Sequence, residues 1–94
     1  MRSLIFIVAV DCPENDIDYL GNDIGYKDNL ATWDSCAKQC ASDVKCFAWS
    51  WLSNTYKDSK VHGRCHLKNN NWATGRNNLT GVISGTKNCK GNFS

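Results

Sequence analysis

Apolar and polar positions follow two different periods in the middle of the chain. Cys36 and Cys40 lie four residues apart, so both thiols fall on one face of a helix that we expect over residues 32–42. Over residues 46–53 the period changes to two, because aromatic residues alternate with smaller ones, as in a strand with one aromatic face. This pattern predicts a helix packed across a sheet.

The aromatic face of that strand consists of Phe47, Trp49 and Trp51. We expect these side chains to lie in the core beneath the helix, together with Trp33 from the helix start. Large aromatic side chains bury much apolar area, so an aromatic stripe on a strand indicates a packing surface.

The rest of the chain predicts short strands joined by polar loops. We expect Ile17 and Tyr19, with Ile24 beyond Gly21, to be inward positions of a short edge strand. The later segments are expected to form a hairpin loop, its return strand, a second loop and a last strand, over residues 54–63, 64–68, 69–76 and 80–87. One helix on a small antiparallel sheet is an α+β fold.

Residues 1–10, MRSLIFIVAV, form an apolar segment that begins with one basic residue. The segment is too short to span a bilayer, which takes about 20 residues. It is similar to the start of a secretory signal, and the alternative is a first strand buried in the fold. We therefore expect a signal-like leader over residues 1–10 and one domain over residues 11–94.

Six cysteines in a chain of 94 residues indicate three disulfides and an oxidising compartment, because so small a domain buries little surface. Zinc sites usually show paired close cysteines or a close histidine pair, and only one cysteine pair is close here, so we expect no metal. Two N-x-S/T sequons, at Asn78 and Asn92, are candidate glycan acceptors. Both observations favour a secreted glycoprotein.

The helix spacing also restricts how the cysteines pair. Cys36 and Cys40 are poorly placed to bond each other, because their Cβ atoms point the same way on the helix. Cys46 can reach back to Cys40 across the turn that follows the helix. The resulting nested set is Cys12–Cys89, Cys36–Cys65 and Cys40–Cys46.

Several motifs around the cysteines match one known family. They are Cys12, Asp18-Tyr19-x-Gly21-Asn22-Asp23, Cys36-x3-Cys40-x5-Cys46, Ala48-Trp49-Ser50-Trp51, Cys65-His66-Leu67-Lys68, and Val82-x-Ser84-Gly85 ahead of Cys89. Residues 12–89 thus resemble a PAN/apple domain, and the resemblance implies a PAN/apple-like fold with the same nested disulfides. It also implies a non-catalytic module that binds proteins, heparin or carbohydrate.

No arrangement of residues indicates catalysis. Ser35, Asp58 and either His62 or His66 supply the residue types of a catalytic triad, but no nucleophile elbow or oxyanion motif accompanies them. We therefore expect a non-catalytic protein without a cofactor, a nucleic-acid partner or membrane insertion. The alternative from another class is a secreted inhibitor or toxin-like protein built on the same scaffold.

Charge is divided unevenly along the chain. Residues 11–35 hold seven acids and one base, a net charge of −6, whereas residues 36–94 hold nine bases and two acids, a net charge of +7. A basic half attracts sulfated glycans or acidic proteins. The alternative is that the two halves neutralise each other in the fold.

One basic surface with an aromatic residue is the candidate ligand-binding site. It consists of Lys60, Arg64, Lys68, Trp72 and Arg76. An aromatic ring in a polar loop suits stacking on a sugar or on a partner's surface, and the four cations favour a sulfated or otherwise acidic glycan or an extracellular protein. The alternative is that Trp72 anchors its loop to the sheet and that binding occurs elsewhere, for example in the groove beside the helix.

Overall fold

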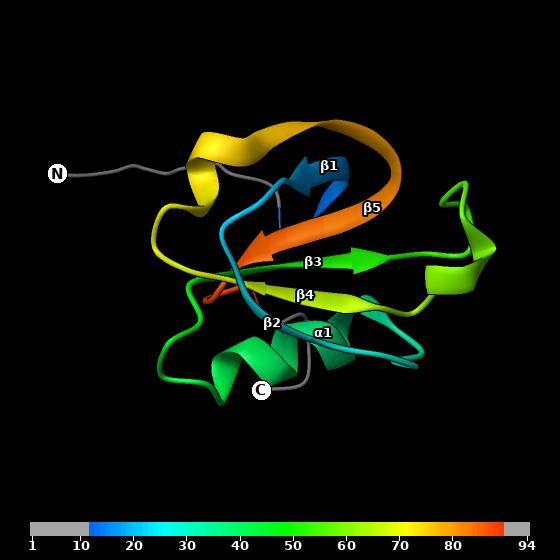
Figure 1. Cartoon of the computed structure of the whole chain (residues 1–94). Helices are drawn as coiled ribbons and strands as arrows, with labels where there is room; N and C mark the ends of the chain where they lie inside the picture. Colours follow the sequence, from blue (N-terminus) through cyan, green and yellow to red (C-terminus); the bar gives the residue numbers. More distant parts are fainter. Residues whose placement is uncertain (1–11, 90–94) are drawn as a thin grey trace, which may run out of the picture.

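The computed structural model describes residues 12–89, which form one helix packed on a five-stranded antiparallel sheet (Figure 1). The predicted leader and Asn92 lie outside the described residues. The strands are β1 (Glu14–Tyr19), β2 (Asp23–Lys27), β3 (Ala48–Leu52), β4 (Cys65–Lys68) and β5 (Arg76–Thr86), in the order β1-β5-β3-β4-β2. The helix is α1 (Trp33–Ala41), and two short 3-10 helices are η2 (Ser59–Val61) and η3 (Trp72–Gly75). The predicted α+β fold is confirmed.

The helix begins where its local sequence favours it. The Thr32 hydroxyl accepts a hydrogen bond from the amide of Ser35, and Asp34 lies in the first turn, where the helix dipole favours a negative charge. Cys36, Ala37 and Cys40 form the buried face. That face lies against β3 and β4, as the four-residue cysteine spacing predicts.

Three disulfides close the fold in the nested arrangement. Two of them attach α1 to its surroundings, Cys36 to Cys65 in β4 and Cys40 to Cys46 in the turn before β3. The third joins Cys12 to Cys89, the two ends of the described chain, which are 77 positions apart in the sequence. The Cα–Cα distances of 5.2 to 5.5 Å are typical of protein disulfides.

Trp49 is the centre of the core under the helix. It is fully buried, and its ring stacks on Trp33 with centroids 5.7 Å apart. It faces Leu67 in β4 and Gly85 in β5, where a Cβ would lie 2.6 Å from the indole. Glycine is required at position 85 because the ring occupies the space of a side chain.

The rest of the aromatic face differs from the prediction. Phe47 is 48% exposed. It precedes the first residue of β3, so it lies at the end of the sheet, where it is not part of the buried core. Trp51 is half-buried, so only part of its ring contributes to the core. The prediction that Phe47 is a core residue is therefore wrong. Trp51 packs against the core as predicted, but it is only partly buried.

The predicted single edge strand is two strands at opposite edges of the sheet. Gly21 and Asn22, both with positive φ, turn the chain after β1 so that β2 pairs with β4 rather than with β5. Tyr19 is buried, but Ile24 is 38% exposed, because every residue of β2 faces solvent at the free edge. The placement of Ile24 as an inward position is therefore wrong.

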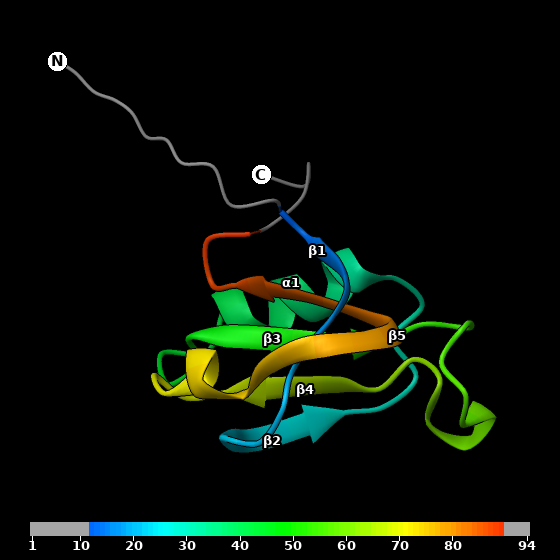
Figure 2. The same ribbon diagram turned by 90° about the horizontal axis from the view of Figure 1, so that it is seen from above.

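The long strand β5 curls around the sheet and carries β1 across the face opposite α1 (Figure 2). Buried hydroxyls join the layers there: Ser50 and Ser84 lie 2.7 Å apart, and Ser84 donates to the carbonyl of Ile17. The amide of Tyr19 donates to Ser50. Both faces of β3 are consequently buried, which explains why small residues alternate with its tryptophans.

Candidate binding site

The structure divides the predicted five-residue surface between the two ends of β4. Lys60 and Arg64 belong to the loop that connects β3 to β4, whereas Lys68 and Trp72 lie at or beyond the far end of β4. Figure 1 shows these loops, in yellow-green and yellow, at opposite ends of the sheet. The five residues therefore do not form one continuous surface.

Arg64 is held by an acid from the N-terminal half of the chain. Its Nε donates to Asp28 at 2.7 Å, and its guanidinium lies 4.4 Å from the ring centre of Tyr26. The hydrogen bond from Arg64 lowers the pKa of Asp28 below its ordinary value. Asp28 and Tyr26 therefore attach the end of β2 to the sheet through this arginine.

Lys68 is almost completely buried, with a side chain that is 4% exposed. Its ammonium donates to Asp23 at 2.5 Å and to the carbonyl of Gly21 at 3.0 Å. A lysine in this position fixes the turn between β1 and β2 and is not available to a ligand.

Arg76 forms an ion pair with Glu14 in β1, and Tyr19 donates to the same carboxylate at 2.6 Å. The hydrogen bond from Arg76 lowers the pKa of Glu14, while burial raises the pKa of Tyr19. Trp72 packs against Tyr19, with ring centroids 4.6 Å apart. Trp72 thus anchors its loop to the sheet, in line with the alternative that the sequence left open.

Acidic residues of the first half of the chain pair with particular basic residues of the second half. Each of three bases from residues 36–94 pairs with an acid from residues 11–35, namely Arg64 with Asp28, Lys68 with Asp23 and Arg76 with Glu14. Of the four predicted cations, Lys60 alone lacks such a partner within residues 12–89, and it is exposed on η2.

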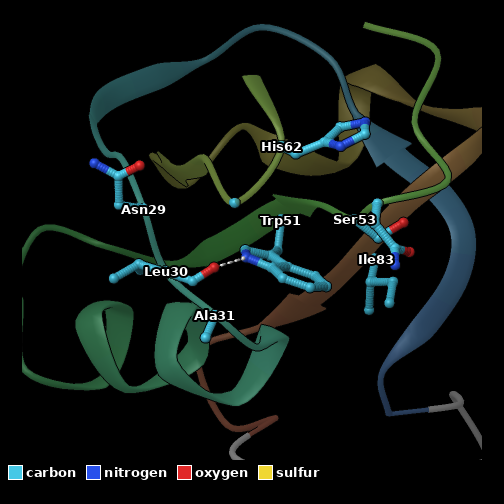
Figure 3. Close-up of a pocket in the computed structure, with 9 residues that line it drawn as sticks. Asn29, Leu30, Ala31, Trp51, Ser53, His62 and Ile83 are labelled. Carbon is cyan, nitrogen blue, oxygen red and sulfur yellow. Dashed lines mark hydrogen bonds between the residues drawn. The ribbon is translucent and has the colours of Figure 1, made fainter. Parts of the chain in front are cut away.

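A groove with a volume of about 660 Å³ lies beside the start of α1 (Figure 3). Four segments form it: the link from β2 to α1, the end of β3, the residues before β4, and β5. We call it the Trp51 groove; it is lined by Asn29, Leu30, Ala31, Trp51, Ser53, Asn54, His62, Gly63 and Ile83.

Trp51 lies between Leu30 and Ile83 in the groove, as Figure 3 shows. Its indole Nε1 donates to the carbonyl of Leu30 at 3.0 Å, which fixes the orientation of the ring. The linker is held in place by a hydrogen bond from the Leu30 amide to Gly63. Gly63 has a φ of +87°, and a Cβ there would lie 3.1 Å from the Leu30 carbonyl, so glycine allows the close approach.

The rim of the groove is polar and uncharged. The side chains of Asn29 and Asn54 are exposed and make no hydrogen bond within residues 12–89. The ring of His62 is engaged through Nε2 with the carbonyl of Tyr56 at 2.6 Å. The groove therefore combines an aromatic surface with two amides that make no hydrogen bond to a described residue, a combination that suits a ligand with an apolar face and polar edges.

The sequence pattern identifies only part of this groove. The two-residue period marks Trp51 but assigns it to the core, and nothing in the sequence indicates that Asn29 and Asn54 line the same groove as this tryptophan. The antiparallel order of β2, β4 and β3 brings these segments together.

The described residues also bear on other classes of function. Within residues 12–89 no three His, Cys, Asp or Glu side chains gather in a way that could hold a metal ion. The same part of the chain has no helix long and apolar enough to cross a membrane. The sequon residue Asn78 is exposed on β5.

Comparison with known proteins adds the family. Residues 17–68 match the model of the PAN domain. The two N-terminal apple domains of Toxoplasma gondii microneme protein 4 share the fold with a TM-score of 0.65 and 21% sequence identity, over 79% of this chain and 43% of that chain. No curated protein sequence matches the chain. Members of the matched family are binding and adhesion modules and are generally non-catalytic. The chain belongs to the PAN domain family.

Proposed function

We propose that this protein is a secreted, non-catalytic module that recognises a carbohydrate or an extracellular protein in the Trp51 groove. The observation that carries the proposal is an oriented tryptophan that lines one groove together with the exposed amides of Asn29 and Asn54. Large concave sites with an apolar floor and a few polar groups are the usual ligand sites of proteins. Three disulfides support secretion, because such bonds persist in oxidising compartments.

The chemistry of the groove favours an uncharged ligand. Among residues 12–89, no Lys, Arg, Asp or Glu lines it, and the one titratable side chain there, His62, is engaged with Tyr56. A pyranose ring can stack on Trp51 while its hydroxyls bond the asparagine amides, and an uncharged peptide segment can use the same groups.

An acidic glycan fits less well than the sequence suggests. To bind Arg64, Lys68 or Arg76, it must compete with Asp28, Asp23 or Glu14, which already accept hydrogen bonds from them. Lys60 remains exposed, but one surface cation contributes little to affinity in a salt solution. We therefore place ligand recognition in the Trp51 groove.

The experiment begins with a glycan array and a pull-down from an extracellular extract, followed by titration of the recovered ligand. Asn54→Ala removes one amide, and Ala31→Trp fills the groove without touching the disulfides. The matched control is Asn70→Ala, which removes an exposed amide in the loop between β4 and η3. We expect both groove variants to weaken binding by about tenfold or more and the control to bind like the wild type. Unchanged binding by both groove variants, or recovery of no ligand, would overturn the proposal.

A further inference from the structure

A second cavity, with a volume of about 190 Å³, lies on the face of the sheet opposite α1. The β4 side chains of Cys65 and Leu67 pack under the helix, so the alternate residues His66 and Lys68 project to the other face. The cavity is lined by Asp18, Leu20, Gly21, Asp23, Leu52, Tyr56, His66, Lys68 and Leu79. It shares no residue with the Trp51 groove.

Three leucines give this cavity apolar walls. Leu52 is buried at 7% exposure, Leu79 is half-buried, and Leu20 is 67% exposed. Walls of this kind suit an aliphatic stem that enters from a partner's surface, because long charged side chains bury their methylene groups along apolar surface. The exposed Leu20 favours a protein partner over a free small molecule, because the partner's surface beside the inserted side chain can contact it.

The ionised groups in the cavity have a net charge of −1. Asp18 and Asp23 contribute two negative charges, and the ammonium of Lys68 contributes one positive charge. Burial, more than the nearby charges, lowers the pKa of His66, which favours its neutral form. A ligand with a single positive charge would neutralise the cavity.

Three acceptors in this cavity are not engaged. Within residues 12–89, the carboxylate of Asp18 accepts no hydrogen bond and forms no ion pair. Lys68 and His66 both approach Oδ1 of Asp23, which leaves Oδ2 open. The hydroxyl of Tyr56 likewise makes no hydrogen bond to a described residue. The cavity already binds one ammonium, that of Lys68, through the carboxylate of Asp23 and the carbonyl of Gly21.

We propose that this cavity binds the side chain of a lysine from a partner protein. An ammonium has three donors, and the cavity offers Asp18, Asp23 and Tyr56 as three acceptors. The volume equals that of about six water molecules in the liquid, at roughly 30 Å³ each, which accommodates the five heavy atoms of a lysine side chain. The site is independent of the Trp51 groove, so the module would engage partners on both faces of its sheet.

The test uses the whole chain, isotopically labelled, and Nα-acetyl-lysine N-methylamide as the probe. We expect saturable amide shifts at Leu20, Gly21 and His66 in a nitrogen–proton correlation spectrum, with a dissociation constant in the millimolar range. Two control probes keep the stem without the charge: the norleucine analogue and the Nε-acetylated lysine analogue. Both should fail to shift these amides.

The variant is Asp18→Asn, which keeps the side-chain shape and removes one acceptor charge. Its control is Asp34→Asn, which changes the net charge of the chain equally from a position on α1. We expect Asp18→Asn to weaken lysine binding by about tenfold, Asp34→Asn to leave it unchanged, and both spectra to remain those of the folded protein. The proposal is overturned by an absence of shifts, by equal binding of an uncharged probe, or by equal affinity of the two variants.

Discussion

The two faces of the sheet are held by different interactions. On the face under α1, two disulfides and the stacked Trp49 and Trp33 join helix to strands with few polar contacts. On the opposite face and at the edges, the N-terminal segment is attached by buried serines and three ion pairs. The first set of interactions is insensitive to pH and salt, whereas the second depends on both.

This difference bears on recognition. Because Arg64, Lys68 and Arg76 attach β1 and β2 to the sheet, these three cations are not free to form a binding surface. An uneven distribution of charge along the sequence can therefore serve the assembly of the fold rather than a ligand. The groove beside the helix, which no charged residue of the described part of the chain lines, then becomes the better site.

Truncation of the core under the helix should have the largest effect. We expect Trp49→Ala to lower the free energy of unfolding by ~3–5 kcal/mol, because it empties a fully buried site. Trp49→Phe is the control: it keeps a ring against Trp33 and removes an indole N–H that has no hydrogen-bond partner among the described residues. Denaturant unfolding measures both. A loss below ~1 kcal/mol for Trp49→Ala would mean that this face does not contain the core.

Removal of the disulfide between α1 and β4 should come next. Replacing Cys36 and Cys65 together by alanine opens a loop of 29 residues, which we expect to cost ~2–5 kcal/mol. Thermal unfolding monitored by circular dichroism measures the loss. The control replaces Cys40 and Cys46, whose bond closes a loop of only 6 residues and should matter less in the chain-entropy model. Equal losses for the two pairs would contradict the entropic account.

The opposite face should respond more weakly and locally. Lys68→Met keeps the stem and removes the ammonium that holds Asp23 and Gly21, with an expected cost of ~1–3 kcal/mol. Hydrogen exchange should accelerate in β2 before it does in α1. The exposed Lys60→Met is the control and should change neither quantity. Uniform acceleration across the whole sheet would show that β2 is not a separately attached strand.

The smallest expected effect is a dependence of stability on pH. The ion pair with Arg76 lowers the pKa of Glu14 in the folded protein, so its stabilisation is full above the unfolded pKa and is lost as pH falls through the folded value. Glu14→Gln should therefore flatten the loss of thermal stability in acid, and Asp18→Asn, which removes a carboxylate without an ion pair among the described residues, should leave it as steep as in the wild type. Identical acid profiles for the wild type and Glu14→Gln would rule out this contribution.

Local periodicity was sufficient to predict the stapled helix and the core under it. The spacing of Cys36 and Cys40 and the alternation around Trp49 each fix which side of an element is buried. Phe47 shows the limit of the method, because a period identifies the face of a strand but not the residue at which the strand leaves the core. Ile24 shows the same limit at a free edge, where neither face is covered.

The site depended on topology and could not be predicted in the same way. Opposite charges in the two halves indicated neutralisation, but the partners of Arg64 and Arg76 follow from β2 and β1 lying at opposite edges of the sheet. The Trp51 groove combines Asn29 and Asn54 from segments separated by α1 and β3. No short-range sequence pattern predicts that these two residues line the same groove.

The most direct test of the account is the salt dependence of binding to the ligand recovered from the array or pull-down. Ligand recognition in the uncharged Trp51 groove predicts a dissociation constant that stays within about twofold as ionic strength rises from roughly 0.05 to 0.5 M, since screening acts only on charges. Substitution of Asn54 by alanine should raise that constant at every salt concentration. Binding that collapses as salt rises, and that Asn54→Ala leaves unchanged, would place recognition on the cations instead.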